Sequence, residues 1–114
     1  MTSDLEQLCF YISPDNFMAF ESHVERLGIP MYKLVGETLN HLIEKYDPKD
    51  SEKLKQWAPI PLDLNKQHLR SAYLTKDQIT TLRDFADKAS TALGQNVQRG
   101  TVIRSAIMEY LKSK

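Results

Sequence analysis

The sequence has one cysteine, three histidines and no long apolar run, and each of these shortages removes a class of protein. With Cys9 alone, no disulfide can form within the chain, which suits a reducing compartment. No stretch approaches the roughly 20 apolar residues that a membrane-spanning helix needs. The acidic start, MTSDLEQ, has no signal-peptide pattern. These features predict a cytoplasmic protein without a membrane partner.

Residues that commonly build active sites are equally scarce. His23, His41 and His68 are far apart in the sequence and have no partner cysteines, so a metal site is not expected. The sequence has no glycine-rich phosphate loop and no paired nucleophile and base, and Cys9 on a predicted strand is expected to be unreactive. We therefore expect no enzymatic activity, no cofactor and no metal.

The charge of the chain is balanced in total but uneven along its length. The 114 residues are enough for one domain with a modest core, and a net charge of zero favours no partner by itself. Residues 1–50 contain four Lys or Arg against nine Asp or Glu, a net charge of −5, whereas residues 51–114 contain eleven against six, a net charge of +5. This asymmetry suggests that one half meets a polyanion or that the halves meet each other, and charge alone leaves open two solvated faces.

The N-terminal part of the chain predicts a strand followed by two helices. Residues 8–12 are apolar and aromatic, which is typical of a strand, and Ser13 followed by Pro14 is a helix-start signal. Apolar residues then recur at helical spacing until Gly28, which is expected to end the helix. Pro30 opens a second amphipathic helix.

The last third of the chain repeats this order. A strand is expected up to Leu74, Thr75 and Gln78 form a capping box for the next helix, and Gly94 is expected to end that helix. An offset of 62 residues aligns the strands and first helices of the two units, and an offset of 68 aligns six stripe positions of their second helices. An accidental match of two helical hairpins is the alternative, because helix pairs are common.

Residues 47–67 connect the units, carry mixed charge and three prolines, and are interpreted as a linker with one helical turn around residues 51–57. Trp57 is expected to anchor this linker to the body by packing. Each unit alone would leave its strand as an unpaired edge. We therefore predict one intertwined domain over 1–114, with units 7–46 and 68–112, in which the strands pair antiparallel and the second helices pack together.

The residues that carry a family resemblance lie between Leu69 and Leu111. They are the strand that ends at Leu74, the capped helix start at Thr75, and the run from Val97 to Leu111, in which an Ile-Arg-x-Ala-Ile segment ends in Tyr-Leu. This stretch resembles the ribbon-helix-helix family of DNA-binding proteins, of the Arc, MetJ and CopG type, and the fused pair is similar to TraY-like relaxosome proteins. The resemblance implies a mostly α, tandem ribbon-helix-helix fold, with a two-stranded antiparallel ribbon plus four helices in a pseudo-twofold single-chain dimer.

In that family the ribbon lies in the major groove of DNA, and its outward side chains contact base edges. Strand alternation assigns six candidates for this role, although a register slip of one residue would exchange the two faces. A solvent-facing strand surface without a ligand is the alternative. The six outward residues are Gln7, Cys9, Tyr11, Leu69, Ser71 and Tyr73.

Phosphate contacts are expected at the starts of the second helices, where free backbone N–H groups favour an anion. Arg104 is expected to be an exposed helix charge rather than a contact. The expected phosphate contacts are Arg99, Gly100 and Thr101 in the second unit, Tyr32 and Lys33 with Met31 in the first, and Arg70, with His68, beside the ribbon.

The resemblance implies sequence-specific binding to double-stranded DNA by a transcriptional regulator (a repressor) or a plasmid-transfer accessory factor. The molecule would be a monomer that acts as a pseudodimer and could associate with others on adjacent DNA sites. The alternative is a protein-interaction module whose acidic N-terminal half docks a toxin, a relaxase or a polymerase. Steep weakening of binding by salt separates the two hypotheses.

Overall fold

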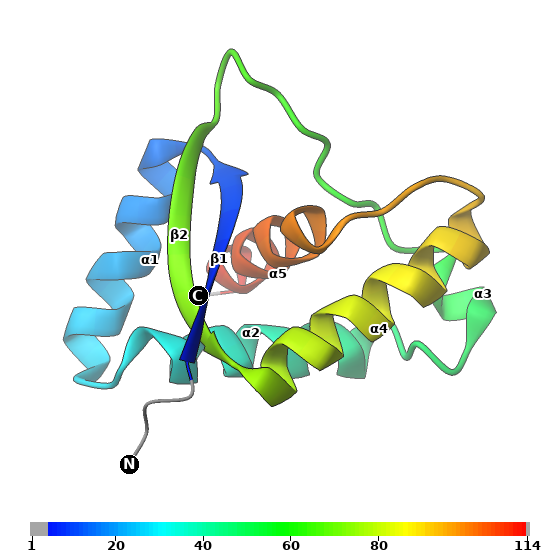
Figure 1. The fold of residues 1–114 in the computed structure, drawn as a ribbon, viewed down its shortest axis with the longest axis horizontal. Helices are drawn as coiled ribbons and strands as arrows, with labels where there is room; N and C mark the ends of the chain where they lie inside the picture. Colours follow the sequence, from blue (N-terminus) through cyan, green and yellow to red (C-terminus); the bar gives the residue numbers. More distant parts are fainter. Residues whose placement is uncertain (1–4, 114) are drawn as a thin grey trace.

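The computed structural model describes residues 5–113, so part of the N-terminal stretch considered above lies outside the described residues. Within this range no helix is long and apolar enough to cross a membrane. The elements follow one another along the chain as β1 (Leu5–Ile12), α1 (Pro14–Leu27), α2 (Met31–Lys45), α3 (Ser51–Leu54), β2 (His68–Thr75), α4 (Lys76–Leu93) and α5 (Arg99–Lys112) (Figure 1).

Strands β1 and β2, far apart in the sequence, form a two-stranded antiparallel ribbon. The register runs from Leu5 opposite Thr75 to Ile12 opposite His68, which confirms the predicted antiparallel pairing. One face of the ribbon is covered by the helices, because apolar side chains alternate along each strand. The buried ribbon residues are Leu8, Phe10, Ile12, Ala72 and Leu74, which alternate with the six residues predicted to point outward.

The helix ends follow the local sequence signals. Ser13 caps α1, since its Oγ accepts a hydrogen bond from the Asn16 N–H at 3.2 Å. Thr75 and Gln78 form the predicted capping box at the start of α4. Gly28 and Gly94 end α1 and α4 with φ values of 65° and 67°, a left-handed conformation that disfavours other residues. All four predicted signals are confirmed.

The core is centred on the packing of α5 against α2, β1 and α4. The predicted contact between the two second helices, α2 and α5, is confirmed. Positions of α2 and α5 that align with each other are buried to a similar degree. In five of the six pairs aligned by the offset of 68 residues both members are buried, and the last pair, Ile43 and Leu111, is partly buried in both helices. At the C-terminal ends of α2 and α5, Lys45 Nζ donates to Glu109 Oε1 at 2.6 Å.

The predicted fold class, a tandem ribbon-helix-helix with four helices, is wrong. Residues 5–113 contain five helices and a single two-stranded sheet, to which each half of the chain contributes one strand. The additional helix, α3, is the turn expected near residues 51–57. Its four residues are too few to show apolar periodicity, and it is stabilised instead by the Asp50 cap and by burial of Leu54.

The segment between α3 and β2 is attached to the body rather than free. Trp57 is 3% exposed, and its ring meets the ring of Phe85 in α4 edge to face, with 5.0 Å between centroids. The predicted role of Trp57 as a packing anchor is confirmed. Beyond Trp57 the chain passes over the end of the ribbon and enters β2 (Figure 1).

Candidate functional site

The outer face of the ribbon carries all six side chains predicted to point outward. They form three directly opposed pairs, and all are exposed except Tyr11, which is half-buried. The predicted alternation is therefore confirmed. The three pairs are Gln7 opposite Tyr73, Cys9 opposite Ser71, and Tyr11 opposite Leu69.

This face is polar but carries no charge. Its amide, hydroxyl and phenol groups can donate and accept hydrogen bonds, and the thiol of Cys9 is free and exposed. Leu69 and Tyr73 are the large apolar side chains that it presents to solvent, at 53% and 56% exposure. A surface of this kind can make directional polar contacts and one or two apolar contacts, but it attracts a polyanion only through residues at its edges.

Arg70 lies at one edge of the ribbon. It is opposite Phe10 in the register, on the helix-covered side, and is half-buried. Its guanidinium lies 6.0 Å from the ring centroid of Phe17, and Nη1 donates to the carbonyl oxygen of Leu69 at 2.9 Å. Arg70 therefore flanks the outer face without forming part of it, as expected for a residue beside the ribbon.

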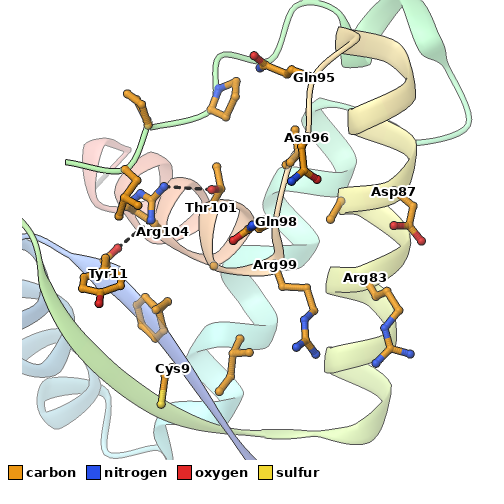
Figure 2. A pocket seen from close by; sticks show the side chains of 18 of the residues that line it. Cys9, Tyr11, Arg83, Asp87, Gln95, Asn96, Gln98, Arg99, Thr101 and Arg104 are labelled. Carbon is orange, nitrogen blue, oxygen red and sulfur yellow. Dashed lines mark hydrogen bonds between the residues drawn. The ribbon is translucent and has the colours of Figure 1, made fainter. Parts of the chain in front are cut away.

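At the other edge, a groove of about 1100 Å³ is lined by residues of β1, α4 and the start of α5 (Figure 2). The segment after Trp57 closes one side of the groove with Pro59, Pro61 and Leu62. Arg83 of α4 and Arg99 of α5 extend their guanidinium groups toward the same end of the groove (Figure 2). Neither takes part in the three ion pairs found among the described residues, and Asp87 is the one acidic residue that lines the groove, so this edge has a net positive charge.

The first turn of α5 lies directly against the ribbon. A Cβ atom at Gly100 would be 3.5 Å from the Cβ of Phe10, so the helix start approaches β1 closely. No side chain caps this turn and no acidic residue occurs in it. Its free N–H groups, together with the exposed Arg99, are a chemically suitable partner for an anion.

The first turn of α2 is less suitable for an anion. It also has no side-chain cap, and Lys33 is exposed. However, the N–H of Lys33 already donates to the carbonyl oxygen of Pro30 at 3.0 Å. The start of α4 also packs against this turn, since Gln78 Nε2 donates to the carbonyl oxygen of Tyr32 at 2.7 Å and would be 2.9 Å from a Cβ at Gly36. The two helix starts predicted to bind phosphate therefore differ, and the start of α5 is the more suitable for an anion.

The expectation that Arg104 is an exposed helix charge is wrong. Its side chain is buried, and it donates to the carbonyl oxygens of Tyr11 and Ile60 and to Thr101 Oγ1. Burial lowers the pKa of the guanidinium from its ordinary value. Positions 102–107 are all buried, so α5 is enclosed on every side over this stretch. The Ile-Arg-x-Ala-Ile pattern does not reveal this enclosure, because it places the arginine between apolar residues, as it would an exposed position.

Sequence reasoning also missed Arg83. It occupies an exposed position of α4, and only the angle between α4 and α5 brings it to the same groove as Arg99. Among residues 5–113, no group of three or more His, Cys, Asp or Glu side chains is arranged to hold a metal ion.

No family model, curated protein or solved structure matches this chain. The functional inference therefore depends on the geometry and chemistry of the ribbon and its two edges.

Proposed function

We propose that this protein binds double-stranded DNA by placing the outer face of the β1–β2 ribbon in the major groove, as a regulator of transcription or a plasmid-transfer accessory factor. The observation that carries the proposal is the set of three opposed, solvent-facing pairs on a ribbon whose other face is buried. A two-stranded ribbon fits the major groove, where each base pair presents a distinct pattern of donors and acceptors.

The side chains of the outer face match that chemistry. The amide of Gln7 can pair with adenine, and the hydroxyl groups of Ser71 and Tyr73 can donate or accept at base edges. Leu69 can contact the methyl group of thymine. The resemblance of residues 69–111 to ribbon-helix-helix proteins supports the same mode of binding.

The DNA backbone would lie along the edges of the ribbon. Arg99, Gly100 and Thr101 at the start of α5 are the strongest candidates for a phosphate contact, because an uncapped helix start and an exposed arginine meet there. Arg83 extends this charged edge along the groove. Lys33 with Tyr32 on α2, and Arg70 beside the ribbon, would provide weaker contacts on the other side.

The proposal is tested by selecting bound duplexes from a random DNA pool and measuring their affinity for the wild-type protein across a salt series. Phosphate contacts require that the logarithm of the association constant falls linearly with the logarithm of salt concentration, by about 0.9 per contact. The pool should also converge on a preferred sequence. A salt-independent affinity, or a pool that stays random, would contradict binding through base edges.

Tyr73→Ala tests base recognition. It should reduce affinity for the selected duplex by roughly 5- to 100-fold, the range for one lost base contact, with a smaller effect on random DNA. Met18→Ala is the matched control, because Met18 lies on α1 and is 63% exposed, compared with 56% for Tyr73. Equal effects of the two variants would contradict the assignment of the outer face.

Arg99→Ala tests the phosphate contact. The variant should flatten the salt slope by about 0.9, so that the loss of affinity between roughly 50 and 200 mM salt becomes about 3.5-fold smaller. Lys53→Ala makes the same change in net charge on α3, which lies away from the ribbon (Figure 1). If both variants flatten the slope equally, overall charge rather than a contact at Arg99 explains the effect.

A protein-interaction module is the second candidate, and the charge distribution favours it. Residues 1–50 have a net charge of −5, and the outer face of the ribbon has no Lys or Arg. A positively charged protein partner would suit the acidic half, whereas DNA would be repelled by it. The salt series separates the two, because failure to bind any duplex at low salt leaves this candidate in place.

A further inference from the structure

Arg104 connects three parts of the molecule that are distant in the sequence. Its Nη1 donates to the carbonyl oxygen of Tyr11 at 3.0 Å, which holds β1 near its end. Its Nε and Nη2 donate to the carbonyl oxygen of Ile60 at 3.0 and 2.7 Å. Nη2 also donates to Thr101 Oγ1 at 3.1 Å, and Figure 2 shows this contact and the one with Tyr11. The side chain is 2% exposed, so water does not replace these contacts.

Ser105 completes the attachment of Ile60. Its Oγ accepts a hydrogen bond from the Ile60 N–H at 2.8 Å, so both backbone polar groups of Ile60 are held by α5. Pro59 and Pro61, on either side, form part of the wall of the groove beside β1. Arg104 and Ser105 together place this wall, and Arg104 alone also holds the end of the strand.

The burial of this guanidinium is unfavourable unless its donors are satisfied. None of the ion pairs among the described residues includes Arg104. Its hydrogen-bond partners are two carbonyl oxygens and a hydroxyl group. A buried cation without a counter-ion is costly, and an apolar side chain would avoid that cost. The aligned position in α2 is Gly36, so this arrangement exists on one side of the ribbon only.

We propose that Arg104 is a positioning residue for DNA recognition, which sets the outer face of β1 at Tyr11 relative to the start of α5. The inference rests on the proposed function. Tyr11 belongs to the face that would contact bases, and Thr101 belongs to the turn that would contact phosphate. Phosphate contacts determine the register of a protein on the duplex, and base contacts determine its sequence preference. A rigid connection between the two converts backbone binding into sequence recognition.

Arg104→Lys is the informative substitution. It keeps the positive charge, but a single ammonium group cannot reproduce the forked geometry that reaches Tyr11, Ile60 and Thr101 together. Ser105→Ala is the matched control, since it removes the acceptor for the Ile60 N–H and leaves the contact with Tyr11 intact. Affinities for selected and random duplexes are measured at one salt concentration, and amide hydrogen exchange is measured without DNA.

For Arg104→Lys we expect affinity for the selected duplex to fall roughly tenfold, the size of one mismatched base pair. Affinity for random DNA should change by less than about twofold, because the phosphate contacts and the charge remain. Exchange should accelerate at the end of β1, the segment around Ile60 and the first turn of α5. For Ser105→Ala, exchange should accelerate around Ile60 alone, and the ratio of selected to random affinity should equal that of the wild type.

Three results would overturn the proposal. If Arg104→Lys keeps the wild-type ratio of selected to random affinity, the contact does not position the ribbon, although DNA binding would stand. Equal loss on both duplexes with faster exchange throughout the chain would make Arg104 a stability residue only. If the wild-type protein itself shows no sequence preference, the proposed function fails and this role of Arg104 fails with it, a result that the wild-type control distinguishes from the first two.

Discussion

Trp57→Ala tests whether the segment between α3 and β2 is a fixed part of the molecule. The substitution removes a buried ring that packs edge to face on Phe85, with an interplanar angle of 86°. It leaves the backbone connection to Ile60 in place. The test therefore isolates the packing anchor from the hydrogen bonds that α5 makes with the same segment.

The expected loss of unfolding free energy is about 3–5 kcal/mol, the range for truncating a buried aromatic side chain to alanine. The aromatic pair contributes about 0.5–1.5 kcal/mol of specific interaction within that range. A chain of this length has a total stability of about 6–17 kcal/mol. The variant should therefore fold at 25 °C with a much reduced margin. Trp57→Phe keeps a ring against Phe85 and should recover part of the loss.

The assay is urea unfolding followed by far-ultraviolet circular dichroism, since the substitution removes the only tryptophan and with it the usual fluorescence signal. Leu64→Ala is the matched control, because Leu64 belongs to the same connecting segment and is 64% exposed. It should change stability by less than about 0.5 kcal/mol. A loss below about 1 kcal/mol for Trp57→Ala would refute the anchoring role.

Two further predictions concern contacts between or within helices. Thr75→Ala removes the acceptor for the Gln78 N–H at 3.1 Å and should lower the free energy of unfolding in urea by about 1 kcal/mol. Thr80→Ala, on the exposed face of α4, is the control and should be nearly neutral. Equal effects of the two substitutions would argue against the cap. Lys45→Met removes the hydrogen bond to Glu109, which raises the pKa of Lys45 above 10.5. The contribution of Lys45 to stability is therefore present below pH 10.5 and is lost as the pH rises through the raised pKa. The difference in unfolding free energy between wild type and variant should be constant near neutral pH and vanish in strong alkali, and a difference already absent at neutral pH would contradict this reasoning.

The features that sequence predicted correctly depend on a few neighbouring residues. Ser13 before Pro14 and the pair Thr75 and Gln78 specify helix starts, because a cap needs an acceptor within three residues of a free N–H. Gly94 specifies a helix end, because the left-handed conformation is strained for other residues. The two faces of the ribbon follow from alternation along each strand.

The site was predictable only where it follows from those local rules. The six residues of the outer face were identified correctly as outward, while α3 was expected only as a turn and the helix count was therefore wrong. Arg83 reaches the groove because of the crossing of α4 and α5, which no short stretch of sequence specifies. DNA binding itself stays a prediction, to be decided by the salt series and the selected pool.

The sequence alone determined the order of the two strands and the four longer helices, the capped starts and glycine ends of α1 and α4, and the apolar face of each strand. These features depend on spacing and on local hydrogen bonds. Only the tertiary structure decided that Arg104 lies inside the molecule. Enclosure of α5 by the ribbon, α2 and the connecting segment leaves its charged position without water. The carbonyl oxygens of Tyr11 and Ile60, 93 and 44 residues away along the chain, replace that water as hydrogen-bond acceptors.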